Sequence, residues 1–200
     1  EPLPAESVDI EAAVGRVLAE DAASSVDLPP FASSAMDGFA LRSVDTPGRL
    51  PVVHRIPAGT PAPRPLEAGE AMGIATGAVV PEGADAVIPF EYVVEHDNTI
   101  EIDERVQAGA NVRPAGGDVG AGATVVEAGI RLGARHLAAL AAAGVPEIRA
   151  ARRPRAAVVV TGSELRPPGE PLAPGQIYEA NGILLEAQLV SAGAEVERAS

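Results

Sequence analysis

The sequence contains no cysteine and no tryptophan, and its aromatic residues are limited to two tyrosines and three phenylalanines. Without cysteine, the chain has neither a disulfide framework nor a thiolate metal site. No apolar run approaches the roughly 18 residues of a membrane span, and no basic start followed by an apolar stretch marks a secretory signal. These absences favour a cytoplasmic protein with no membrane partner.

Basic residues are also scarce, with 15 Lys and Arg against 28 Asp and Glu and a formal net charge of −13. Nonspecific nucleic-acid binding depends on cationic side chains that neutralise phosphates, so nucleic acid is not an expected partner. An acidic protein that handles an anionic ligand needs divalent cations, helix N-termini or focused arginines at its site.

Proline and glycine are abundant, with 19 and 21 residues respectively. From Val26 to about Val126 they interrupt the chain at short intervals and leave short β-like runs between them. The predicted strands are Phe39–Leu41, Val52–Ile56, Ala86–Val94 and Thr99–Ile102. This pattern predicts a small, mainly β domain.

The flanking segments have a different character. The first predicts a short helical turn near Glu11–Val14 and a strand through Arg16–Ala19. After the β-rich region, Ala134–Ala143 is rich in strong helix formers and is followed by Gly144 at a suitable C′ position. We therefore expect the two flanks to pair with each other.

The last segment predicts one strand–helix–strand unit. Ala156–Val160 is a continuous apolar run of the kind found in strands buried on both faces. Asn181 is a suitable N-cap for a helix that ends at Gly193, and Glu195–Ala199 predicts a second strand. A single βαβ unit cannot cover both faces of a parallel sheet, so we expect the apolar residues of this helix to lack a cover.

Four short blocks place polar groups beside glycine or a tight turn. They are SSAMDGFA (Ser33–Ala40), TGAVVPEG (Thr76–Gly83), GANVRPAGGDVGAG (Gly109–Gly122) and TGSEL (Thr161–Leu165). Asp37 before Gly38 suits a turn that projects a carboxylate, since Asp tolerates turn geometry and Gly accepts positive φ. Glu164 follows an apolar strand, where ligands of open α/β sheets collect.

Each block alone has a simpler explanation. An Asp-Gly or Thr-Gly pair is mostly a turn signal, and Arg113 could simply pair with a neighbouring carboxylate. Asp97 and Asn98 predict only a hairpin turn. The three histidines lack ligand spacing, so the metal ligands stay unassigned.

Taken together and in this order, the four blocks resemble the bacterial MoeA proteins and the E domain of gephyrin, from about Val8 to Ser200. The resemblance implies a molybdopterin molybdotransferase of molybdenum cofactor biosynthesis. Such an enzyme inserts molybdate into adenylylated molybdopterin, depends on Mg²⁺ and releases AMP. It also implies a homodimer and, as a possible partner, the upstream molybdopterin adenylyltransferase.

The fold that the resemblance implies is a multidomain α+β architecture. Residues 5–25 and 123–152 would form a discontinuous β-rich domain, interrupted by an inserted mixed β-rich domain at 26–122. Residues 153–200 would be the truncated front of an α/β molybdopterin-binding-like domain. Because later blocks of the family lie beyond this sequence, we expect the isolated chain to be inactive.

The resemblance also carries site residues. The catalytic positions that match are Asp37, Thr76, Asp118 and Glu164, and polar loop groups expected to bind the cofactor are Asn111, Arg113, Thr161 and Gly162. Carboxylates that hold a hard cation by oxygen would offset the charge that develops on phosphoanhydride cleavage. Two alternatives are a non-catalytic scaffold of the same family and a general Mg²⁺-dependent phosphohydrolase.

Overall fold

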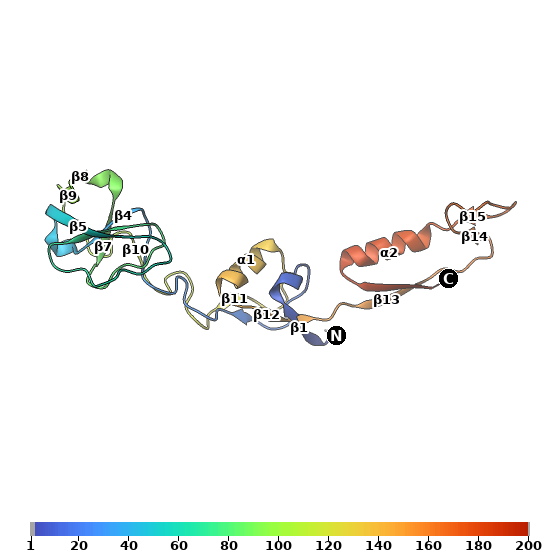
Figure 1. Ribbon diagram of the computed structural model, residues 1–200. Coiled ribbons are helices and arrows are strands. Elements are labelled where there is room, and N and C mark those ends of the chain that lie inside the picture. Colours follow the sequence, from blue (N-terminus) through green and yellow to red (C-terminus); the bar gives the residue numbers. More distant parts are fainter. Residues whose placement is uncertain (1–2, 200) are drawn as a thin grey trace. The chain divides into compact units, whose positions relative to one another are not determined.

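The computed structural model describes residues 3–199 (Figure 1). The chain divides into two compact units. The middle unit comprises Ser24–Ala123. The terminal unit combines the segment that ends at Ala23 with the segment that begins at Thr124. A separate third domain at residues 153–200 stays a prediction. No helix within the described range has the length and apolar character needed to span a membrane.

A six-stranded sheet forms the middle unit, in the order β7-β4-β6-β5-β9-β8. Its strands are β4 (Gly38–Leu41), β5 (Gly48–Ile56), β6 (Ala71–Ile74), β7 (Ala86–Pro89), β8 (Val94–His96) and β9 (Thr99–Ile102). Neighbouring strands are antiparallel except for β5 and β6, which run parallel. The expected β-rich character of this region is therefore confirmed.

The predicted strand Ala86–Val94 is wrong as a single element. Strand β7 ends at Pro89, whose φ is −63°, and a 3₁₀ helix, η3 (Phe90–Tyr92), follows it. The N–H of Val93 turns back to the carbonyl oxygen of Phe90, so the chain changes direction before β8. Strand β6 escaped prediction because its sequence, AMGI, shows no alternation of apolar and polar residues.

The core of the middle unit lies on both faces of β4, whose four residues are all buried. Phe39 and Leu41 face one cluster, which includes Ile100. Ala40 faces the other cluster with Met72. Successive side chains of a strand point to opposite faces, so this short strand joins two hydrophobic clusters and must itself be apolar throughout.

A two-residue turn joins β8 and β9. Asp97 and Asn98 have φ of +47° and +58°, the left-handed values that a type I′ hairpin turn requires at both central residues. The hairpin turn predicted from this pair is confirmed.

In the terminal unit the two flanks of the chain pair with each other. Strand β1 (Ala5–Asp9) lies antiparallel to β12 (Glu147–Ala151), and β2 (Ala22–Ala23) lies antiparallel to β11 (Thr124–Val126). A 3₁₀ helix, η1 (Ile10–Ala12), follows β1 where a helical turn was predicted.

Arg16–Ala19 is not a regular strand, contrary to the prediction. It forms only isolated bridges, from Val17 to Arg131 and from Leu18 to Ala150. The segment nevertheless runs between the two neighbouring chains, because Leu18 N–H donates to Ile130 and Ala19 N–H donates to Arg149. Each of these bridges stands alone, so neither side has the consecutive pairs that a regular ladder requires.

The two predicted helices are present. Helix α1 (Ala134–Ala142) is followed by Gly144 with φ +70°, as its C′ position requires, and Leu140 is its buried anchor. Helix α2 (Asn181–Ala192) begins one residue earlier than predicted: Ala180 is the N-cap position, and Asn181 already lies in the helix.

Helix α2 connects the parallel strands β13 (Arg155–Val159) and β16 (Glu195–Ala199). Before it, β14 (Leu165–Arg166) pairs with β15 (Ile177–Tyr178). Strand β13 is not buried on both faces, since Val159 is 66 % exposed. We expected apolar residues of this helix to have no packing partner. Three of them, Ile183, Leu184 and Leu185, are each about half exposed, which confirms that expectation for these residues.

A pair of glycine variants tests the packing of the middle unit. A β-carbon on Gly83 would lie 2.3 Å from the carbonyl oxygen of Leu66, whereas one on Gly59 would meet nothing within 4 Å. Both glycines have similar positive φ, +93° and +81°. Gly59→Ala should therefore cost only the left-handed strain, about 1–2 kcal/mol.

Gly83→Ala should lower the free energy of unfolding by about 1–3 kcal/mol more, because the added methyl group meets rigid backbone. Urea unfolding followed by circular dichroism measures both variants. Equal losses in the two variants would contradict the close approach of Leu66 to Gly83.

Candidate functional site

The two-residue strand β3 (Ser33–Ser34) brings three of the four sequence blocks together. On one side it pairs antiparallel with β10 (Val112–Arg113), from the glycine-rich third block. On the other side Ser34 N–H donates to Ala78 O at 3.0 Å, and Gly77 N–H donates to Ser34 O at 2.8 Å. Segments far apart in sequence are thus bonded to the same two residues.

Asp37 and Thr76 meet where β4 begins and its neighbour β6 ends. The Thr76 backbone N–H donates to Asp37 Oδ1 at 2.7 Å, across 39 residues of sequence. The pairing of β4 with β6 explains the contact, because Gly38 lies opposite Ile74 and places the start of one strand beside the end of the other. Thr76 was predicted as a catalytic position, and in this contact it uses its backbone N–H, not its side chain.

Gly38 has a different role from the one predicted. It is not a positive-φ turn residue but the first residue of β4. A β-carbon there would lie 2.1 Å from the carbonyl oxygen of Ile88 on the neighbouring strand β7. The glycine is required because the two backbones approach so closely, and this approach fixes the position of Asp37 just before the strand.

Ser34 was missed by the sequence analysis. Its side chain is almost fully buried, and its Oγ donates to Met36 O at 2.6 Å and accepts from Met36 N–H at 3.3 Å. Serine commonly bonds its own backbone two residues on, so this signal was present in the sequence. The contact fixes the loop that carries Asp37.

Three polar side chains of the third block bond to other groups of the chain. Arg113 and Asp118 form an ion pair, with each side chain about half exposed. Asn111 adopts φ +53°, and its side-chain amide donates to Val87 O at 2.9 Å. The arginine–carboxylate pair envisaged from the sequence is therefore present, and the Asn111 amide is a structural anchor.

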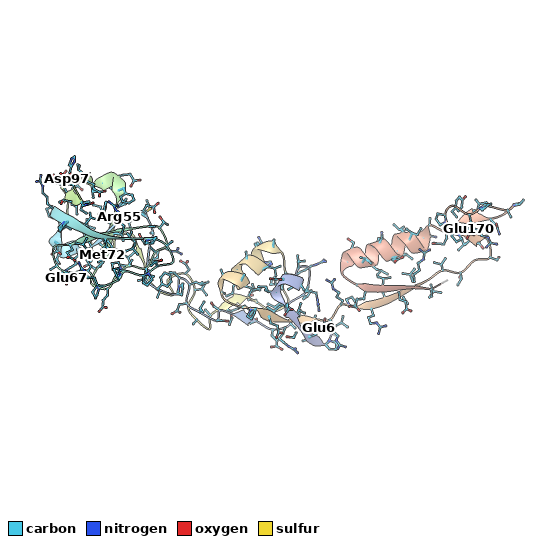
Figure 2. All side chains as sticks on the ribbon, viewed as in Figure 1. Glu6, Arg55, Glu67, Met72, Asp97 and Glu170 are labelled. Carbon is cyan, nitrogen blue, oxygen red and sulfur yellow. The ribbon has the colours of Figure 1, made fainter. Side chains whose placement is uncertain are left out.

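A cleft of about 410 Å³ opens beside Asp37. Its lining includes Arg55, Ile74, Ala75 and Phe90. Figure 2 labels Arg55, which comes from β5, beside Met72 of the adjacent strand β6. Arg55 and Phe90 had no role in the sequence analysis, because only the pairing of strands brings them next to Asp37.

The fourth block lies in the terminal unit. Thr161, Gly162 and Glu164 follow β13 and are exposed. Thr161 and Gly162 line a cleft of about 540 Å³ together with Glu179 and Arg198. Glu164 is therefore placed in a different unit from Asp37, Thr76 and Asp118.

Glu179 is a further residue that the sequence analysis missed. It is 7 % exposed, pairs with Arg198 and accepts the N–H of Gly182 at 2.5 Å. Its carboxylate therefore satisfies the start of helix α2, the role that was predicted for Asn181. A charged side chain this deeply buried requires such partners.

No group of three or more His, Cys, Asp or Glu side chains in residues 3–199 could hold a metal ion. Of the three carboxylates predicted for the site, Asp37 accepts the N–H of Thr76, Asp118 pairs with Arg113, and Glu164 lies in the other unit.

Comparisons with known proteins identify the family of the chain. A family model described as the MoeA N-terminal region (domain I and II) matches residues 1–144. Molybdopterin molybdenumtransferase 2 of Mycobacterium tuberculosis is 41 % identical over 95 % of this chain and 49 % of its own length. Molybdopterin molybdenumtransferase of Staphylococcus epidermidis is 34 % identical over 95 % of this chain and 47 % of its own length.

Solved structures give the same result. Two structures of the molybdopterin biosynthesis MoeA protein from Pyrococcus horikoshii each match 98 % of this chain. One has a TM-score of 0.84 with 39 % identity, over 52 % of its own chain. The other has a TM-score of 0.89 with 34 % identity, over 54 % of its own chain. This chain spans about half the length of the relatives it matches.

Ser34→Ala tests whether the Ser34 side chain holds the Asp37 loop. Losing both Oγ bonds at a buried site should lower the free energy of unfolding by about 1–3 kcal/mol. The Thr76 amide should then exchange its hydrogen at least about tenfold faster, measured by NMR-detected hydrogen exchange. Ser163→Ala, at an exposed serine of the other unit, is the control. An unchanged Thr76 exchange rate in Ser34→Ala would refute this role.

Proposed function

The chain belongs to the MoeA family, and we propose that it forms part of a molybdopterin molybdotransferase, which inserts molybdate into adenylylated molybdopterin and releases AMP. The observation that carries the proposal is the convergence of three polar blocks on Ser33–Ser34. It places a fixed carboxylate, Asp37, at the mouth of a cleft. Fixed polar groups beside a cavity are what the positioning of two reactants requires.

In this enzyme Arg113 binds a phosphoryl oxygen of the substrate. Its guanidinium has five donors and is about half exposed, so donors remain after the pairing with Asp118. Asp118 orients the guanidinium. A focused arginine of this kind offsets the repulsion that an acidic protein, with a net charge of −13, exerts on an anionic substrate.

Asp37 holds and orients the substrate at the cleft. The Thr76 N–H keeps one carboxylate oxygen in place, which limits the motion of the group before the substrate arrives. Thr161 and Gly162 contribute a second polar surface beside the 540 Å³ cleft of the terminal unit. Glu164, exposed after β13, acts from the same loop.

Mg²⁺ would neutralise the charge that develops on the phosphoryl group. The described residues do not fit a cation site by themselves, because they contain no group of three or more suitable side chains. Dependence on Mg²⁺ is therefore proposed only for the complete enzyme.

The finer architecture follows from the same proposal. Residues 26–122 are an inserted domain, and residues 153–200 begin an α/β molybdopterin-binding-like domain in a homodimeric enzyme. The parallel β13–α2–β16 crossover supports the second assignment, since such units build α/β sheets.

A chimera tests the function. Residues 1–200 replace the matching half of the Mycobacterium tuberculosis relative, and reconstitution of a molybdoenzyme measures cofactor formation. Asp37→Ala, Asp118→Ala and Glu164→Ala should each lower the yield at least about tenfold, or on the order of 1.4 kcal/mol of transition-state stabilisation.

Asp103→Asn, at an exposed carboxylate outside the site, is the matched control and should keep full activity. Thermal unfolding should be close to normal in all four variants, because exposed loop carboxylates contribute little to core packing. The assignment fails if the three site variants reconstitute the molybdoenzyme as well as the unsubstituted chimera does.

The chain alone should not make the cofactor. It supplies about half the length of its relatives, and the apolar residues Ile183, Leu184 and Leu185 of α2 are about half exposed, so the loop with Glu164 lacks firm support. Mixing the purified chain with adenylylated molybdopterin, molybdate and Mg²⁺ should give no AMP above background. Turnover equal to that of the chimera would show that this half contains the whole catalytic site.

A further inference from the structure

The cleft beside Asp37 combines few chemical groups in a defined arrangement. Its floor is apolar and comes from Ile74 and Ala75 at the end of β6. The lining contains one carboxylate, from Asp37, one guanidinium, from Arg55, and one aromatic ring, from Phe90. An apolar cleft with a few convergent polar groups is typical of a small-molecule site.

Asp37 offers only hydrogen-bond acceptors to a ligand. Its Oδ1 accepts the Thr76 N–H, and no Lys, Arg or His of residues 3–199 forms an ion pair with it. Each carboxylate oxygen has two acceptor positions, so both oxygens can still accept from a ligand. A ligand with two adjacent, coplanar N–H donors matches this geometry, because both donors are then satisfied at once.

Arg55 offers only hydrogen-bond donors to a ligand. Its side chain is about half exposed and pairs with Glu95, and its guanidinium carbon lies 5.8 Å from the centre of the Phe39 ring. Gly73 leaves room for it, since a β-carbon there would lie 3.0 Å from Arg55 Cγ. An arginine has five N–H donors, so it can still donate to a carbonyl oxygen in the cleft.

Phe90 gives the cleft its aromatic wall. Phe90 is 43 % exposed and forms a T-shaped contact with buried Phe39, with ring centres 5.0 Å apart and planes at 88°. The contact with Phe39 anchors Phe90 while much of its surface stays open to a ligand. A flat heterocycle gains contact area there by stacking or by an edge-to-face arrangement.

We propose that this cleft binds the 2-amino-4-oxopyrimidine ring of a pterin, an assignment that rests on the proposed function for the choice of a pterin. Asp37 accepts hydrogen bonds from the 2-amino group and the adjacent N3–H, and Arg55 donates to the 4-oxo oxygen. Phe90 packs against the ring. Adenine does not fit, because ring nitrogens that are acceptors flank its amino group and would face a carboxylate oxygen.

Fluorescence titration of the purified chain with pterin and with lumazine tests this assignment. Lumazine is the same bicyclic ring with an oxo group in place of the 2-amino group, so it lacks one of the two donors that Asp37 requires. Pterin should bind at least about tenfold more tightly than lumazine, and adenosine should bind no better than lumazine. Equal affinity for pterin and lumazine, or no detectable binding of pterin, would overturn the proposal.

Three variants separate the roles of the polar groups. Asp37→Asn keeps an oxygen for the Thr76 N–H, so the fold should persist, but the preference for pterin over lumazine should disappear. Arg55→Ala and Phe90→Ala should weaken both ligands by similar factors, because both rings carry the 4-oxo group and the same flat surface. A preference for pterin that survives in Asp37→Asn would show that another group selects the ring.

Asp103→Asn is the matched control for loss of a carboxylate and should bind pterin like the unsubstituted chain. The binding assay needs no turnover, so its result is independent of cofactor formation in the chimera. Pterin selectivity without chimera activity would contradict the proposed function alone. Chimera activity without pterin selectivity would contradict the proposed cleft alone.

Discussion

The site of the middle unit depends on the backbone hydrogen bonds of Ser33 and Ser34, which connect three segments that are far apart in sequence. One edge of this two-residue strand pairs with Val112–Arg113, and the other edge bonds Gly77 and Ala78. The hydroxyl of Ser34 also bonds to the backbone of Met36 and fixes the turn that leads to Asp37. Three loops are thereby held together by main-chain hydrogen bonds, and buried Ala78 and half-buried Val112 add contacts with the core cluster that includes Met72.

Much of the fold follows from local sequence signals. The α1 helix, the Asp97–Asn98 turn and the strand Glu195–Ala199 all appear where composition and turn chemistry predict them. Strand β6 and the segment Arg16–Ala19 differ from prediction because long-range pairing decides their structure. A short apolar run such as AMGI carries no local sign of its partners.

In the candidate site, too, some features could be predicted from local sequence and others depend on long-range strand pairing. Sequence motifs pointed to Asp37, Thr76, Arg113 and Asp118 as separate site residues. The structure brings Asp37 into contact with Thr76 and pairs Arg113 with Asp118. The motifs could not show that Thr76 contacts Asp37 through its backbone, or that Arg55 would line the cleft beside Asp37. Those features depend on the register of β4, β5 and β6, which no motif contains.

The central claim, that the fold holds Asp37 in place through the Thr76 N–H, has a direct spectroscopic test. An acid titration of the chain, followed by ¹H–¹⁵N NMR, would report the Thr76 amide as the Asp37 carboxylate gains a proton. The account predicts a large change in the Thr76 amide proton shift that is absent in Asp37→Asn, since the amide of Asn does not titrate. A Thr76 amide that does not respond to acid, or that responds equally in Asp37→Asn, would contradict it.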